Sequence, residues 1–351
     1  MVARKKNSSA SARSAARTVR LLALAVLVLA LLSALGAGGA FWWWTNQPLR
    51  LAAGRVEFTV PPGASLRAAA DAAAASGVRE PGVLLGGFFR LAARGRSIKP
   101  GDYAVTQGMT PDDLLNALTR GDRITLTLTL IEGWNFRQVR QTLDKAPGLR
   151  HDTAQMSGAQ IMAALGRDGV APEGRFFPDT YRYFRQASDL DVLRESLREM
   201  DRQLAAAWEA RAPDTPLQSA DQALILASIV EKETGRPEDR PLVAGVFSNR
   251  LRIGMPLQTD PTVIYGLGEK FDGNLRRADL QADTPWNTYT RKGLPPTPIA
   301  LPGKAALLAA VQPAATKALY FVARGDGSSQ FSPSLPEHNA AVRKYQLGGG
   351  R

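Results

Sequence analysis

The sequence contains no cysteine and only two histidines, His151 and His338. The absence of cysteine excludes disulfide bonds, thiolate catalysis and cysteine-ligated metals. Two histidines are too few for a multi-histidine metal site, and neither lies in a recognisable nucleophile motif. We therefore expect the chemistry of this chain to depend on carboxylates, with no metal and no cofactor.

Taken alone, the net charge of +12 could suggest nucleic acid or an anionic surface as a partner, but its distribution along the chain predicts no nucleic-acid binding. The arginines are spread along the chain without a basic stripe between aromatic residues, and much of the excess lies in the first twenty residues. Apolar residues make up 44% of the 351 residues, which predicts a packed protein with two folded domains and additional segments.

The uncharged run Leu21–Trp44 predicts a transmembrane helix, because about 20 apolar residues are enough to cross a bilayer. Trp42–Trp44 end this run as an interfacial aromatic belt. The basic residues in 1–20 predict a cytoplasmic tail, so the rest of the chain would lie outside the inner membrane. The small residues in 34–40 leave a cleaved signal peptide as the alternative interpretation.

Residues 55–121 predict a small α+β module, because strand and helix patterns alternate with turn residues over this short span. The expected elements are a strand at 56–60, a helix at 66–75 with Ser65 as its N-cap, a helix at 81–94, a strand at 101–105, and a helix that Thr110 caps and Pro111 opens.

Residues 122–345 predict a larger α+β domain. Residues 124–131 alternate between apolar residues and threonine, which predicts a strand with its leucines on one side. Helices are expected at 135–145 and at 190–211, where apolar residues at helical spacing indicate structural packing. The predicted fold class is therefore α+β, with an N-terminal transmembrane helix, a small module and a larger domain.

An apolar helical stretch in this domain ends in two acidic residues, Glu231 and Glu233. Residues two positions apart point about 200° away from each other on a helix. Glu233 continues the apolar stripe of Leu226, Ile229 and Val230, which predicts a half-buried carboxylate with a raised pKa, as an acid catalyst needs. The alternative is an ordinary solvated glutamate in the last helical turn.

The residues that follow this helix carry many hydrogen-bonding groups between glycines and prolines, and aromatic residues lie among them. Such mixtures can hold a sugar, although each residue alone could equally be structural. The candidate binding residues are Asn249, Gln258, Thr259, Asp260, Thr262, Tyr265, Asn287 and Tyr289. Glu173, in an earlier dense loop, is a further candidate and could be the second carboxylate of an ordinary glycosidase pair.

Five segments of the chain carry distinctive motifs: EGRFFPDTY, LASIVEKETG, VFSNRLRIGMPLQTDPTVIYGLG, NTYTRKGLPPTPIALPG and YFVARGDGSSQFSPSLPEHN. Together they closely resemble the YceG-like family of endolytic murein transglycosylases. They occur in the family's order and span most of residues 124–345, and a single N-terminal anchor also fits the family.

The resemblance implies a lyase that cleaves the glycan strands of peptidoglycan between N-acetylmuramic acid and N-acetylglucosamine, leaving a 1,6-anhydro-muramic acid end. It implies that Glu233, the second glutamate of the Glu-Lys-Glu triplet, is the catalytic residue. It also implies that 122–345 is the catalytic domain and that 55–121 resembles a LysM-like, glycan-binding subdomain. Such an enzyme would terminate the elongation of nascent strands, with peptidoglycan synthases or division proteins as candidate partners.

Two alternatives to this function stay open. One is a hydrolase of the same glycan, a muramidase, in which Glu233 is the acid and either Asp260 or Glu173 is the second carboxylate. The other is a non-enzymatic scaffold protein of cell-wall synthesis.

Overall fold

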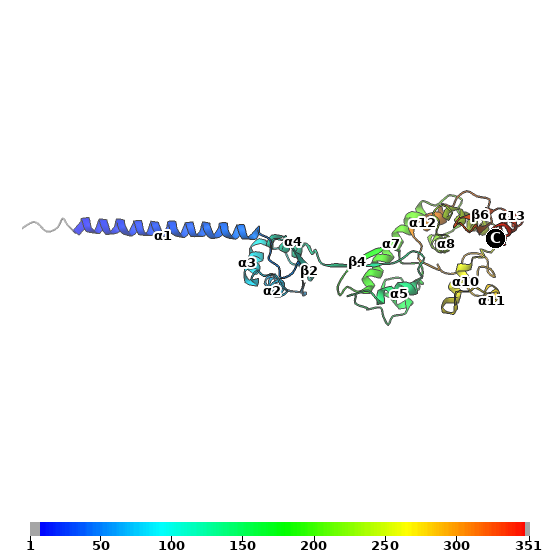
Figure 1. Ribbon diagram of the computed structural model, residues 1–351, viewed down its shortest axis with the longest axis horizontal. Coiled ribbons are helices and arrows are strands. Elements are labelled where there is room, and N and C mark those ends of the chain that lie inside the picture. The colour runs from blue at the N-terminus through cyan, green and yellow to red at the C-terminus, as the bar shows by residue number, and fades with distance from the viewer. Residues whose placement is uncertain (1–7, 348–351) are drawn as a thin grey trace, which may run out of the picture. The chain divides into compact units, whose positions relative to one another are not determined.

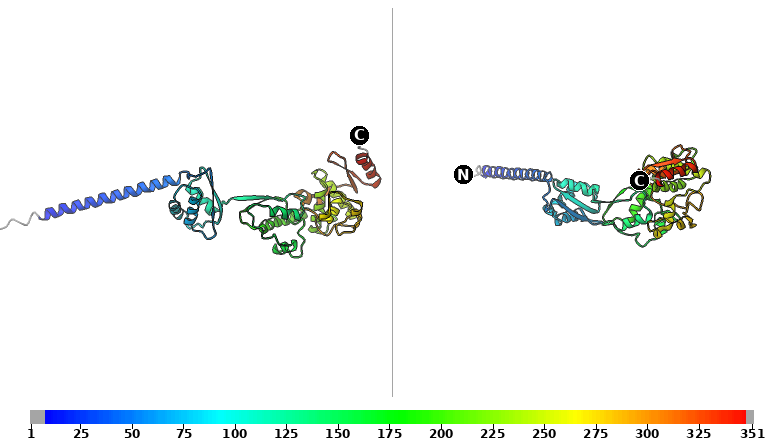
Figure 2. Two further views of the ribbon diagram at one scale, coloured as in Figure 1. Left: turned by 60° about the horizontal axis from the view of Figure 1, so that its bottom comes forward. Right: turned by 45° about the vertical axis from the view of Figure 1, so that its right-hand side comes forward.

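The computed structural model describes residues 8–347 and divides the chain into two compact units, Met1–Ile124 and Thr125–Arg351 (Figures 1 and 2). The first seven residues of the expected basic tail and the glycine-rich end at 348–350 lie outside the described residues. Each unit has hydrophobic cores of its own, which lie in different sets of elements.

The first unit begins with helix α1, Ser8–Thr45. Within it, the 27 residues Val19–Thr45 are long and apolar enough to cross a membrane and are not buried by the rest of the chain. The expected span of 21–44 lies inside this segment. Near the end of α1, Phe41 and Trp44 pack against the core of the module that follows.

That module has five elements around one core, and its two strands pair antiparallel. The expected elements are confirmed with small shifts at their ends. The side chain of Thr110 accepts a hydrogen bond from the Asp113 backbone N–H, and the helix stops at Gly121, whose positive φ of 85° suits glycine. The elements are β1 (Arg55–Val60), α2 (Leu66–Ala75), α3 (Gly82–Ala92), β2 (Gly101–Thr106) and α4 (Pro111–Arg120).

The second unit begins with an antiparallel pair of strands covered by helices. The expected strand is confirmed, with Leu128 buried and its neighbouring threonines exposed. Its partner strand, 180–184, was not predicted, because its aromatic residues are embedded in a loop-like sequence. The elements are β3 (Thr125–Thr129), α5 (Phe136–Asp144), α6 (Gly158–Ala164), β4 (Thr180–Phe184) and α7 (Asp189–Glu209).

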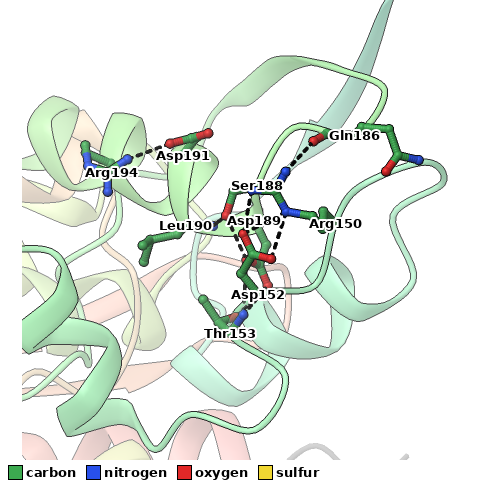
Figure 3. Close-up of polar contacts among 9 residues, drawn as sticks. All are labelled: Arg150, Asp152, Thr153, Gln186, Ser188, Asp189, Leu190, Asp191 and Arg194. Atoms are coloured by element: carbon green, nitrogen blue, oxygen red, sulfur yellow. Dashed lines mark hydrogen bonds and ion pairs between the residues drawn. The ribbon is translucent and has the colours of Figure 1, made fainter. Parts of the chain in front are cut away.

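A buried carboxylate fixes the start of the long helix α7 (Figure 3). Asp189 is completely buried and accepts hydrogen bonds from the backbone N–H and the hydroxyl of Thr153, the latter at 2.6 Å. Beside it, Arg150 forms an ion pair with Asp152 at 2.8 Å. These contacts tie the loop before α6 to the helix.

The rest of the second unit is built around helix α8, Ala220–Glu233, which packs against α7, α9, α10 and α12. Seven of the eight residues from Ala223 to Val230 in α8 are buried. The middle of the helix is therefore enclosed on every side, and its buried surface is not limited to one stripe. The remaining elements are α9 (Arg240–Arg252), α10 (Asp260–Leu267), the 3-10 turn η1 (Gly268–Lys270), α11 (Arg277–Gln281), α12 (Lys304–Val311), β5 (Tyr320–Ala323), β6 (Ser329–Ser332), α13 (Leu335–Val342) and the π-helical turn η2 (Arg343–Leu347).

Two buried serines provide a test of this core. Ser228 of α8 donates to the carbonyl of Ile225 and accepts from the backbone N–H of Ile299 at 3.0 Å, whereas the hydroxyl of the equally buried Ser248 has no partner among the described residues. Ser228→Ala leaves a buried N–H unsatisfied and is expected to lower the free energy of unfolding by about 1–3 kcal/mol.

The control Ser248→Ala removes an unsatisfied hydroxyl and is expected to be neutral or slightly stabilising. Chemical denaturation of both variants measures the difference. Equal destabilisation by the two substitutions would contradict this description of the core.

Candidate active site

Glu233 is the last residue of α8, and Thr234 after it is extended, with φ −147° and ψ 130°. The helix therefore ends at Glu233, two residues before Gly235. A carboxylate in the last turn is unfavourable to the helix dipole, so local stability does not explain its presence. The helix core carries this side chain to the edge of a cleft, where it is half-buried.

The Glu233 carboxylate is oriented by Thr259, the residue before α10. The hydroxyl of Thr259 donates a short hydrogen bond to Oε1 of Glu233. Thr259 is itself buried, and its backbone N–H donates to the hydroxyl of Thr288 at 3.1 Å. The Thr262 hydroxyl bonds to the Thr259 carbonyl and to the Thr288 hydroxyl, at 2.8 and 2.9 Å. Three threonines thus fix one oxygen of the carboxylate.

Burial raises the pKa of the Glu233 carboxyl above its ordinary value, and the negative charge of Asp260 raises it further. The hydrogen bond from Thr259 and the positive charge of Arg250 act in the opposite direction. Desolvation is the largest of these effects. The site therefore favours a protonated carboxyl at a higher pH than an exposed glutamate would allow.

The cleft beside Glu233 has a volume of about 720 Å³. Gln258, Asp260 and Tyr289 line it, and the Tyr289 hydroxyl donates to Asp260 at 2.6 Å. The other wall comes from β5, β6, α13 and η2. Its lining residues include Tyr320, Phe321, Ser329, Leu335, His338 and Asn339. We did not predict this wall, although its sequence segment was among those resembling the family.

Arg250 of α9 joins the two sides of the cleft. It is buried, and its guanidinium donates to the carbonyls of Leu257 at 2.6 Å and Leu319 at 2.7 Å. It also lies 5.2 Å from the ring centroid of Tyr320, which stacks on His338 at 5.1 Å. The sequence indicates Arg250 as one of the polar groups near the site, but it does not predict that this arginine is buried.

Gln258, which lines the cleft together with Arg250, has a positive φ of 50°, which is rare for a residue other than glycine. Its backbone N–H donates to the Thr288 carbonyl at 3.0 Å. The left-handed turn brings Leu257, Gln258 and Thr259 into the positions that the cleft requires.

Three further candidate residues, like Thr259, lie in the framework of the site and do not line the cleft. Thr262 acts through Thr259. Asn287 is completely buried. Its amide nitrogen donates to the carbonyls of Asp279, Leu280 and Ala282, and its amide oxygen accepts from the Tyr289 N–H. Asn249 donates to the carbonyls of Thr316 and Ala318 at 2.9 and 3.0 Å. These side chains position the segments on which the cleft residues lie.

Tyr265 and Glu173 line a different cavity, of about 350 Å³. Glu173 is buried and accepts from the backbone N–H of Phe136, the first residue of α5, at 3.0 and 3.2 Å. It is also hydrogen-bonded to Tyr265, and burial raises its pKa to about 7. Glu173 therefore links α5 to α10 and does not face Glu233 across the cleft.

Glu233 is half-buried as expected, but Glu231, which the helical facing did not place at the core, is also withdrawn from solvent. The side chain of Glu231 is only 7% exposed, accepts from the Gly303 N–H at 2.9 Å and lies 3.6 Å from Arg240. Because α8 is enclosed on every side, both of its faces are buried. What separates the two residues is their surroundings: Glu231 is held by protein groups, and Glu233 opens onto the cleft.

Comparisons with known proteins identify the family of this chain. The YceG-like family model matches residues 58–344, so the chain belongs to the YceG-like family. An endolytic murein transglycosylase of Bacillus subtilis is 30% identical over 269 residues, which cover 70% of this chain and 72% of that protein.

An endolytic murein transglycosylase of Streptococcus pneumoniae is 27% identical over 323 residues, and the match covers 82% of this chain but only 57% of that protein. The crystal structure of a YceG-like protein from Listeria monocytogenes matches with a TM-score of 0.52 and 26% identity. It covers 82% of this chain and 98% of that structure.

Glu173 provides a test of the second cavity. A folded-state pKa near 7, above the ordinary 4.5, means that the native protein loses stability as pH rises from about 4.5 through 7. Glu173→Gln removes this loss, so its stability relative to the native chain should increase over that range by up to about 3 kcal/mol.

Chemical denaturation of both proteins at several pH values between 4 and 8 measures this change. This range includes both the ordinary pKa of 4.5 and the raised pKa of about 7. A stability difference independent of pH would show that the carboxyl is not held as described.

Proposed function

We propose that this chain is a membrane-anchored endolytic lytic transglycosylase of peptidoglycan. The observation that carries the proposal is a single carboxyl with a raised pKa, Glu233, in a large cleft of a YceG-like fold. The names of the relatives support the substrate class.

The reaction begins with proton transfer from Glu233. The Thr259 hydroxyl occupies Oε1, which leaves Oε2 to carry the proton toward the glycosidic oxygen of a muramic acid residue. As that bond breaks, positive charge develops at C1 of the muramoyl ring. Once Glu233 has given up its proton, it is a negatively charged carboxylate in partly apolar surroundings. There it stabilises the positive charge at C1.

The same carboxylate next acts as the base. It removes the proton from the C6 hydroxyl of the muramoyl ring, and the oxygen attacks C1 to close the 1,6-anhydro bond. Because the nucleophile belongs to the same sugar, its effective concentration is high and no second carboxylate is needed to activate water. The products are a strand with an anhydro end and a strand with a free hydroxyl.

The rest of the cleft binds and orients the glycan. Gln258, Asp260 and Tyr289 contact the sugar on one side, and Tyr320 and His338 form an aromatic wall on the other. Thr259, Thr262, Asn249, Asn287 and Arg250 position these groups. Glu173 and Tyr265 act further away, by holding α10 against α5.

In this proposal the anchor crosses the inner membrane with the N-terminus in the cytoplasm, and the reaction takes place at the outer face of that membrane. There the enzyme would cut nascent strands and so end their elongation, close to peptidoglycan synthases or division proteins. The β1–β2 module at 55–121 would act as the LysM-like subdomain that holds the strand, and 122–345 would be the catalytic domain.

One observation favours a hydrolase as a second candidate. Asp260 lies in the same cleft as Glu233, so a second carboxylate is present where a water could be activated. A scaffold without activity has no such observation in its favour.

Digestion of isolated peptidoglycan by the native chain and by Glu233→Gln tests the proposal. The native chain should release fragments with anhydro ends, lighter by one water than reducing ends, as measured by mass spectrometry. Glu233→Gln should reduce the cleavage rate by at least about 100-fold, because it cannot donate or accept the proton.

The matched control is Glu231→Gln, which alters the other glutamate of the pair but leaves the cleft carboxyl intact. It should retain anhydro products if it folds. Reducing ends from the native chain would identify the hydrolase, and undiminished cleavage by Glu233→Gln would exclude Glu233 as the acid.

A further inference from the structure

Helix α3 of the first unit carries apolar residues on both of its faces. Leu85, Phe88 and Phe89 are buried in the module, as expected for a packing helix. On the outer side, Val83 is 64% exposed and Leu91 is 72% exposed. A helix that is apolar all round normally lies inside a protein or in a membrane.

The exposed apolar residues form one stripe. Positions four apart are rotated by about 40° on a helix, so Val83, Gly87 and Leu91 lie in one row with Leu84 beside it. Scattered surface leucines are common and need no explanation, but a row of this kind on an otherwise folded module marks an interaction surface.

The stripe adjoins the end of the apolar segment of α1. The ring of Phe88 lies 6.1 Å from that of Phe41 and 6.2 Å from that of Trp44, so α3 packs against the last turns of α1. The neighbouring Trp42 and Trp43 are 69% and 62% exposed, in the manner of residues at a membrane interface.

Basic residues accompany this stripe. Arg90 lies in the last turn of α3 and Arg94 follows it, and both are exposed. Neither forms an ion pair within residues 8–347. An apolar row bordered by arginines suits a surface of acyl chains beneath anionic headgroups.

We propose that α3 is seated in the outer interface of the bilayer that α1 crosses, with Val83, Leu84 and Leu91 entering the lipid and Arg90 and Arg94 contacting its phosphates. The occupant of the stripe is therefore the lipid surface and not another protein. This inference rests on the proposed membrane anchor and is independent of the reaction at Glu233. It makes the small module part of the anchor.

The absence of cysteine allows a direct test with single-cysteine variants of the full chain in vesicles of phosphatidylethanolamine and phosphatidylglycerol. An environment-sensitive fluorophore is attached at Leu91→Cys, or at Leu27→Cys inside α1. The control is Thr59→Cys, an exposed position of β1 on the side away from the module core. Quenching by nitroxide lipids and by aqueous iodide is then measured.

The proposal predicts lipid quenching and iodide protection at positions 91 and 27, and the reverse at 59. Adding Val83→Ser and Leu84→Ser to Leu91→Cys should remove the lipid quenching at 91, and because both side chains are exposed the module should stay folded. Iodide access at 91 equal to that at 59, with 27 in lipid, would overturn the docking alone. Water exposure at 27 as well would overturn the anchor together with it.

Discussion

The site depends on one constraint, the placement of a carboxyl group at the open end of a helix that is otherwise enclosed. Helix α8 is packed on every side, so its last residue is fixed in position and poorly hydrated. The Glu233 carboxyl resists ionisation there, because the charged form would be only partly hydrated in the cleft. Burying a carboxyl at this position is unfavourable, but the hydrophobic core stabilises α8 independently of its final turn.

The surrounding residues fix the orientation of the Glu233 carboxyl and adjust its pKa. Thr259 occupies one oxygen, and the threonine network fixes Thr259. Arg250 holds the backbone on both sides of the cleft and keeps its positive charge close enough to limit the rise of the Glu233 pKa. Glu231, two residues earlier, has the same chemistry and similar burial, but its hydrogen bond to Gly303 makes it a structural group.

Local sequence patterns predicted the elements that local interactions decide. The cap at Thr110, the alternation in 125–129 and the apolar stripe of α7 required only neighbours in sequence. The apolar residues before Glu233 predicted that this side chain is half-buried, although the same reasoning missed the burial of Glu231. The second wall of the cleft was missed, because Tyr320 and His338 meet Arg250 only through tertiary packing. Nothing in the sequence alone reveals that Glu173 faces α5 and Tyr265 rather than the cleft.

The central claim is that the fold holds Glu233 protonated above the pH at which an ordinary glutamate ionises. Its carboxyl can be titrated directly by carbon-13 NMR of chain labelled at the glutamate side chains, with its signal assigned as the one that Glu233→Gln removes. The account predicts a midpoint clearly above the ordinary value of 4.5. A midpoint at or below 4.5 would contradict it.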